Sequence, residues 1–143
     1  MDRQALKDRA LTVVNALLTK RIELAKDRLK RGRAEIRLED NIGALAVAEA
    51  NIKMAVSTET TTDGKPIFTN EMQRKAEIEK RMKDDRWVTH WQSVIKRNKR
   101  KLLRLRAGEE VSSAYIRFDE SLAQIYTSDL VWHANRGVEL NQN

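Results

Sequence analysis

A single proline, Pro66, divides this chain into two long stretches with few residues that oppose a helix. Proline in a helix interior costs about 3 kcal/mol and glycine about 1 kcal/mol relative to alanine. The 143 residues contain one proline and five glycines, and 34% of them are charged. This composition is typical of long helices. We therefore expect an all-α protein in which a long helix lies on each side of the proline.

The first helix is predicted over residues 2–56. Its apolar residues recur at alternating spacings of four and three, the heptad pattern of a helix that packs on another helix. This stripe consists of Leu18, Ile22, Ala25, Leu29, Gly32 and Ile36. The apolar positions then move to Leu38, Ile42, Leu45, Ile52 and Val56. The shift indicates a change of register near residue 40, a candidate kink in a helix that we expect to be unbroken.

A loop is predicted over residues 57–69, because STETTTDGKPIF collects β-branched, glycine and proline residues. Thr69 and Asn70 are the candidate N-caps of the second helix, and Asn70 and Gln73 have capping-box spacing. This second helix is predicted over residues 70–126, and Gly108 is a candidate break within it. The remaining residues, 127–143, are predicted to form a tail with one short helix that starts at Ser128. The stripe of the second helix is Val88, Trp91, Ile95, Asn98, Leu102 and Leu105, continued by Val111, Tyr115, Phe118, Leu122 and Ile125.

These elements predict one elongated domain over residues 1–143. Two long helices joined by one loop fold back as an antiparallel, coiled-coil-like hairpin, here followed by a short C-terminal helical segment. A turn centred near residue 63 would place residues 96–106 opposite residues 20–30. Both segments are basic, so the prediction brings two basic segments together.

The most unusual segment is SVIKRNKRKLLRLR, residues 93–106. From Lys96 to Arg106 it holds seven basic residues and no acidic one, and the net charge of the whole chain is +7. Seven charges over roughly 16 Å of helix approach the charge density of duplex DNA, about one negative charge per 1.7 Å. Basic residues on a helix are more often a solvated face balanced by acids, but here the balancing acids are missing. We therefore expect contact with a nucleic acid.

The candidate nucleic-acid-binding residues come from both basic segments and avoid the apolar stripes. No zinc-finger, helix-turn-helix or RNP signature is present, so binding to the phosphate backbone without sequence preference is expected. The candidates are Lys96, Arg97, Lys99, Arg100, Lys101, Arg104 and Arg106, with Arg28, Lys30, Arg31 and Arg33 from the first helix. Trp87 is added because an exposed indole can stack on an unpaired base.

Other polar and aromatic residues have structural interpretations. Trp91 lies on the stripe and is expected in the core, and Asn98 is expected to fix helix register. His90 and His133 are too few for an ordinary histidine metal site, and the absence of cysteine excludes thiolate zinc. We expect no cofactor and no metal.

Enzymatic chemistry is not predicted. The carboxylates of Asp84, Asp85, Glu77 and Glu79 each have Lys or Arg nearby at helical spacing, as in surface ion pairs. Gly64 and Lys65 lack the remainder of a Walker motif. No apolar run of membrane-spanning length and no secretory leader are visible. We therefore expect a cytoplasmic location and no membrane role.

The segment DGKPIFTNEMQRKAEIEKRMKDD, residues 63–85, resembles one that recurs in small helical bacterial and prophage proteins. Those proteins are similar to the UvsY-like recombination mediators of phages. The resemblance implies an oligomeric single-stranded-DNA-binding protein that helps to load a recombinase where a single-strand-binding protein competes. It implies no catalytic residue, and the basic run lies outside it.

The expected function is thus non-enzymatic binding of nucleic acid, single-stranded DNA before RNA, in phage or bacterial recombination. Two alternatives remain. A small helical subunit of an RNA-guided CRISPR effector would also be basic and indifferent to sequence. A phage scaffolding or coiled-coil adaptor protein would use its heptads for protein contacts only. A homo-oligomer is expected, because Val13, Val14, Leu17 and Leu24 extend the apolar surface of the first helix beyond one stripe.

Overall fold

The computed structural model describes residues 2–140, with side chains described as far as Arg136. Three helices make up almost all of this range: α1 (Arg3–Thr58), α2 (Glu71–Asp84) and α3 (Arg86–Leu140). No strand occurs among these residues beyond an isolated bridge between Thr60 and Pro66. The protein is all-α, as predicted, and α1 and α3 form a long antiparallel helix pair.

The first helix and the loop agree closely with the prediction. Helix α1 is unbroken through residue 40 and ends where the hydroxyls of Ser57 and Thr58 donate to the carbonyls of Lys53 and Met54. The loop turns at Gly64, whose φ of 77° lies in the left-handed region that glycine tolerates best. Asn70 is the N-cap of α2, because its side chain accepts a hydrogen bond from the backbone N–H of Gln73 at 2.8 Å.

The second half of the chain differs from the prediction. The helix predicted over 70–126 is two helices, because Asp85 is non-helical, with φ −75° and ψ 124°. Its carboxylate accepts hydrogen bonds from the backbone N–H groups of Trp87 and Val88, both at 2.8 Å, and so caps the start of α3. Helix α3 continues through Gly108 and through Ser128, so the predicted tail helix is the last part of α3. Residues 141–143 of the predicted tail lie outside the described range.

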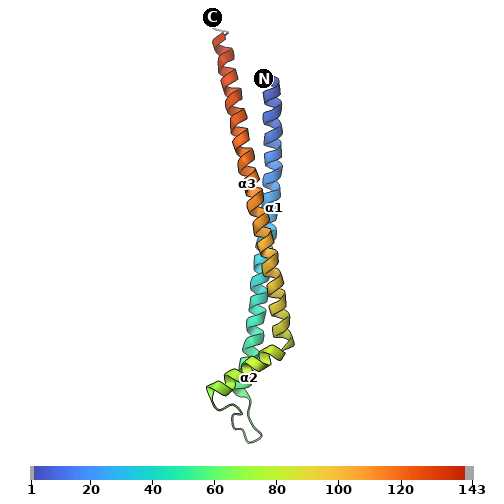
Figure 1. Ribbon diagram of the computed structural model, residues 1–143, viewed down its shortest axis with the longest axis vertical. Coiled ribbons are helices and arrows are strands. Elements are labelled where there is room, and N and C mark those ends of the chain that lie inside the picture. The colour runs from blue at the N-terminus through green and yellow to red at the C-terminus, as the bar shows by residue number, and fades with distance from the viewer. Residues whose placement is uncertain (1, 141–143) are drawn as a thin grey trace. The chain divides into compact units, whose positions relative to one another are not determined.

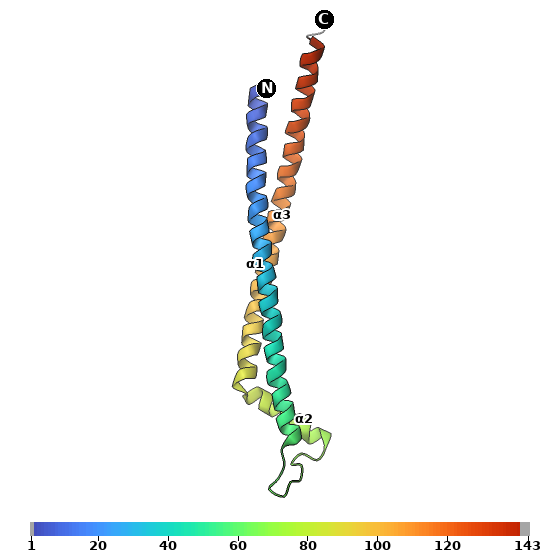
Figure 2. The same ribbon diagram turned by 180° about the vertical axis from the view of Figure 1, so that it is seen from behind.

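The chain forms two compact units, each built from parts of both long helices. Unit 1 comprises the chain up to Arg31 and from Arg104, and unit 2 comprises Gly32–Leu103. Unit 2 contains the loop and α2, which lies across the C-terminal end of α1 in both views (Figures 1 and 2). Arg81 holds α2 there by a bond to Glu59, the residue after α1, at 2.6 Å, and it also bonds Glu77 of α2 itself at 2.7 Å. The hydrogen bond to Glu77 and, to a smaller extent, the one to Glu59 raise the pKa of Arg81 above its ordinary value, so its guanidinium remains positively charged.

The buried apolar residues of each unit follow heptad spacing along the helices. In unit 1, Leu17 and Leu24 of α1 form a core cluster with Ile116 of α3. In unit 2, the buried residues are Ile52, Val56, Val88, Ile95 and Leu102. The stripe predicted for residues 88–105 is therefore the packing surface: Val88, Ile95 and Leu102 are buried, and Trp91, Asn98 and Leu105 are half-buried.

The two apolar stripes predicted over residues 18–36 and 111–125 are not the packing surface, and most of their residues belong to unit 1. Leu18, Ile22, Leu29 and Ile36 are 53–64% exposed, and the buried residues lie one position away at Leu17 and two positions away at Leu24. On α3, Val111, Tyr115, Phe118 and Ile125 are 56–62% exposed and Ile116 is buried. The register change predicted near residue 40 is also absent, since the buried and half-buried positions keep heptad spacing from Leu17 to Ile52.

These two stripes were wrongly predicted because the packing surface of unit 1 contains charged residues. Lys20 pairs with Asp119 at 2.6 Å, and Arg31 pairs with Glu109 at 3.1 Å. On α1, Lys20 lies between the buried Leu17 and Leu24, and Arg31 lies seven residues beyond Leu24. On α3, Glu109 and Asp119 lie seven residues before and three residues after the buried Ile116. Apolar periodicity is therefore more regular on the exposed surface of the unit than on its packing surface, and it predicts the wrong face.

Candidate nucleic-acid interface

The central part of the basic run lies in unit 2 on the first half of α3. All five of its basic side chains are exposed, and the residues that alternate with them, Ile95, Asn98 and Leu102, are turned toward α1. The five are Lys96, Arg97, Lys99, Arg100 and Lys101. Among the residues that the structure describes, none of these five makes an ion pair within 4.0 Å. They are the main free charge of the predicted set.

The end of the run lies in unit 1. Arg104 and Arg106 are both exposed on α3, and Arg104 has no ion pair within the described range. Helix α3 is continuous from Arg86 to Leu140, so local helix geometry fixes the spacing between neighbouring side chains of the run. Basic residues three and four positions apart are neighbours on a helix and repel each other.

The second basic segment is mostly neutralised inside unit 1. Arg28 and Arg31 both contact Glu109, at 3.3 Å and 3.1 Å, and Lys30 lies 3.6 Å from Asp27. Arg21 pairs with Glu120 in the same way. Arg33, which belongs to unit 2, is exposed and makes no ion pair among the described residues. Of the four candidates on α1, only Arg33 therefore lacks an acidic partner among the described residues.

The predicted pairing of the two basic segments is wrong. Ion pairs place Lys20 beside Asp119 and Arg31 beside Glu109, so residues 20–31 lie opposite the acidic segment 109–119 of α3. The midpoint in sequence between the two residues of each pair is near residue 70. The prediction assumed a turn centred near residue 63. The difference arises because α2, with its 14 residues, belongs to the connection and not to the second long helix.

Trp87 is exposed on the first turn of α3, as a stacking residue would need to be. Its side chain is 54% exposed, and the guanidinium of Arg86 lies over its ring at 5.2 Å from the centroid. The ring of His90 meets Trp87 edge-on with centroids 6.2 Å apart. Arg86 was not among the residues predicted from the sequence, although a basic residue directly beside a tryptophan is a recognisable signal of cation–π contact.

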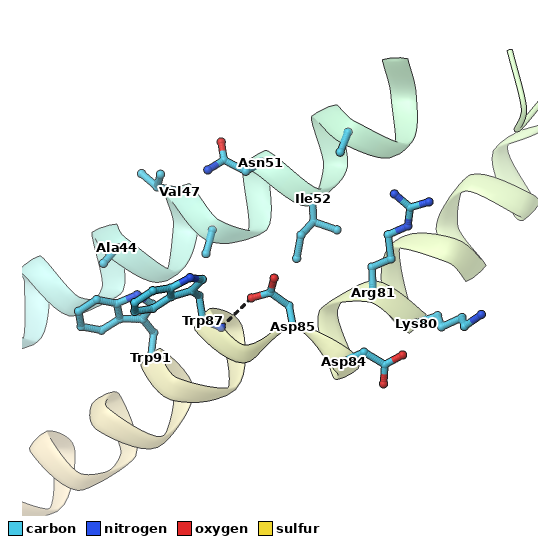
Figure 3. Close-up of a pocket in the computed structure, with 12 residues that line it drawn as sticks. Ala44, Val47, Asn51, Ile52, Lys80, Arg81, Asp84, Asp85, Trp87 and Trp91 are labelled. Carbon is cyan, nitrogen blue, oxygen red and sulfur yellow. Dashed lines mark hydrogen bonds between the residues drawn. The ribbon is translucent and has the colours of Figure 1, made fainter. Parts of the chain in front are cut away.

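A groove of about 630 Å³ in unit 2 runs beside the two tryptophans. Figure 3 shows the indoles of Trp87 and Trp91 at one end and Lys80 and Arg81 at the other. The lining residues are Ala44, Val47, Ala48, Asn51, Ile52, Ala55, Lys80, Arg81, Asp84, Asp85, Trp87 and Trp91. Trp91 is half-buried, in agreement with the expectation that it contributes to packing. Small side chains of α1 thus leave room for a flat group against an indole.

The described residues contain neither a metal-binding group nor a membrane-spanning helix. Within this range, no three residues among His, Asp and Glu are grouped so that they could hold a metal ion. Also within this range, none of the helices has the length and apolar character needed to cross a lipid bilayer.

Comparison of the chain with known protein families, with curated protein sequences and with solved structures finds no match. A function is therefore inferred from the residues described above.

Proposed function

We propose that this protein is a non-enzymatic nucleic-acid-binding protein that contacts the phosphate backbone without sequence preference. The observation that carries the proposal is the contrast between the two basic segments. Arg28, Lys30 and Arg31 have acidic partners, whereas the five basic residues from Lys96 to Lys101 are exposed and unpaired. A polyanion is the ligand that would supply the missing negative charge.

The electrostatics of the run favour an extended anionic ligand. Like charges three or four residues apart destabilise a helix by about 0.2–0.5 kcal/mol per pair, and phosphates placed between them would remove this repulsion. The five side chains also differ in direction around α3, since neighbouring helix residues are about 100° apart. Such an arrangement suits phosphate contacts and offers no fixed pattern for reading base edges.

Trp87 favours a single strand over a duplex. Stacking of an unpaired base on an aromatic side chain contributes about 1–3 kcal/mol, and every base has a face that can stack. Trp87 is exposed, lies beside a groove with room for a planar group, and is on the same helix as the free charges. We therefore place single-stranded DNA first among the polymers, with RNA as the other possibility to test.

The proposed biological role is that of a recombination mediator in the cytoplasm of a bacterial or phage-infected cell. This part rests on the resemblance of residues 63–85 to UvsY-like proteins. In the structure these residues form the second half of the loop and α2, together with the cap residue Asp85. The partners implied are a strand-exchange recombinase and a single-strand-binding protein that competes with the recombinase.

The deciding experiment measures binding of single-stranded DNA, duplex DNA and RNA as a function of salt. One phosphate contact for each of the five basic residues from Lys96 to Lys101 and one for Arg104 make six, which on a single strand predict a log–log salt slope of about −4, at about −0.7 per contact. The triple variant Lys99→Glu, Arg100→Glu and Lys101→Glu should weaken binding and flatten the slope to about −2. A matched control, Lys53→Glu, Lys65→Glu and Lys83→Glu, makes the same charge change at exposed positions of unit 2.

The control variant should bind more tightly than the test variant and keep the steep slope. If both triple variants, still helical, lose affinity equally, net charge and not the run is responsible. If the test variant binds as the unaltered chain does, the proposed site is wrong. Salt-independent binding or none would favour the coiled-coil adaptor, and co-purification with RNA and large protein partners would favour the CRISPR subunit.

A further inference from the structure

Unit 1 exposes two apolar stripes that its own packing does not use. On α1, the exposed side chains are Leu11, Leu18, Ile22 and Leu29, at 53–64%, and on α3 they are Val111, Tyr115, Phe118 and Ile125, at 56–62%. We call these the α1 stripe and the α3 stripe. Single exposed apolar residues are common on proteins, but both stripes follow heptad spacing, which is the pattern of a surface that packs against a helix.

The charges around the two stripes are opposite in sign. Residues 7–31 of α1 include eight basic and three acidic residues, whereas residues 109–132 of α3 include five acidic and one basic residue. Some of these charges are already paired inside the unit, as Lys20 is with Asp119. Others are exposed and make no ion pair in the described part of the chain, notably Lys7 and Lys26 on α1 and Glu110 and Asp129 on α3.

This charge difference selects one way of covering the stripes. Packing of two α1 stripes would bring basic residues together, and packing of two α3 stripes would bring acidic residues together. Packing of an α1 stripe on an α3 stripe brings opposite charges together, which favours this arrangement over the two like-charged ones. Each stripe also has several large apolar side chains to bury, which supplies the main driving force for association.

We propose that the α1 stripe of one copy of this protein packs on the α3 stripe of a second copy. Every copy carries both surfaces, and each uses a different surface toward each neighbour. Such a heterologous contact leads to a closed ring if the rotation between copies closes, and to a filament if it does not. The inference does not depend on nucleic-acid binding and holds for the free protein.

The test uses the full chain without nucleic acid, and two variants that each remove one stripe. Leu18→Glu with Ile22→Glu places acids on the α1 stripe, where they repel an acidic α3 segment. Phe118→Lys with Ile125→Lys places bases on the α3 stripe, where they repel a basic α1 segment. Control variants Ala16→Glu and Thr127→Lys alter exposed positions of the same helices outside both stripes.

Sedimentation velocity at micromolar concentration gives a distinct result for each arrangement. The unaltered chain and both controls should associate, and each stripe variant alone should be monomeric. An equimolar mixture of the two stripe variants should associate again, because one intact α1 stripe and one intact α3 stripe remain. A mixture that stays monomeric would overturn the proposal, as would a monomeric unaltered chain.

Continued self-association of the Phe118→Lys, Ile125→Lys variant would also overturn it, in favour of contact between two α1 stripes. Circular dichroism establishes that the variants keep the helix content of the unaltered chain. If a charged variant loses helicity, the alanine versions, Leu18→Ala with Ile22→Ala and Phe118→Ala with Ile125→Ala, replace it. These should raise the dissociation constant at least tenfold, and unchanged association would count against the contact.

Discussion

Arg31 and Arg33 lie two residues apart in one basic segment and have different surroundings. Arg31 is half-buried and lies 3.1 Å from Glu109, whereas Arg33 is exposed and makes no ion pair within the described range. The difference arises because two residues on a helix are about 200° apart, so one faces the partner helix and the other faces solvent. A basic segment in a sequence therefore contains both structural and free charges, and only packing separates them.

At the residue scale, replacing Asp85 should destabilise the start of α3. Its carboxylate accepts two backbone hydrogen bonds at the start of α3, and Asp85→Ala leaves both N–H groups without this partner. Loss of such a cap costs about 0.5–2 kcal/mol, so thermal unfolding should shift downward by a few degrees. Asp85→Asn, which keeps an acceptor, should have a smaller effect.

The control for this prediction is the neighbouring residue. Asp84 is exposed and makes no hydrogen bond or ion pair among the described side chains, so Asp84→Ala should leave the melting temperature nearly unchanged. Equal losses in the Asp84→Ala and Asp85→Ala variants would mean that general charge removal, and not the cap, determines the result.

At the scale of the elements, local chemistry predicted the loop and the cap of α2 well. The loop composition around Pro66 and the capping residue Asn70 act over a few residues and are visible without a partner helix. The stripe from Val88 to Leu102 was also predictable, because apolar residues dominate the packing surface of unit 2. Asp85 was missed, since the apolar periodicity of its neighbours suggested one helix although aspartate is a common N-cap.

The packing surface of unit 1 could not be obtained in the same way. It depends on Lys20 and Arg31 being paired with Asp119 and Glu109, and those partners are about eighty to one hundred residues away in the sequence. Apolar periodicity gives no information about which polar residues are compensated by a distant element. The free part of the candidate site, Lys96–Lys101, was predictable because the run contains no acid. The ion pairs of the other basic segment, residues 20–33, were not predictable, because they depend on acidic residues of α3.

The corrected packing surface predicts different effects for two adjacent leucines. Leu17 is 8% exposed and belongs to the core cluster, so Leu17→Ala should destabilise the fold by about 2–5 kcal/mol. Leu18 is 53% exposed, so Leu18→Ala should change the stability of the monomer by no more than about 0.5 kcal/mol. Urea unfolding at a protein concentration below that of association measures both values.

If the two variants were equally destabilised, the packing surface would have to include both residues. If Leu18→Ala were the more destabilising change, the stripe predicted from sequence would be the true one. Leu18→Ala should instead show its effect in sedimentation at higher concentration, because Leu18 belongs to the α1 stripe.

At the scale of the whole molecule, the two proposed surfaces lie in different units. The free charges from Lys96 to Lys101 belong to unit 2, and the α1 and α3 stripes belong to unit 1. Substitutions can therefore alter one surface while leaving the residues of the other in place. If both proposals hold, assembly would place several basic runs on one DNA strand and raise the apparent affinity through effective concentration.

The variant Phe118→Lys with Ile125→Lys tests this coupling, because its charge and its effect on assembly oppose each other. It adds two positive charges, which by charge alone should strengthen binding to a polyanion. If assembly multiplies weak contacts, the variant should nevertheless bind a long single strand at least tenfold more weakly than the unaltered chain does. On an oligonucleotide short enough for one copy, the two proteins should bind equally or the variant more tightly. Fluorescence anisotropy with both lengths gives the comparison, and tighter binding of the variant to both would show that assembly does not contribute.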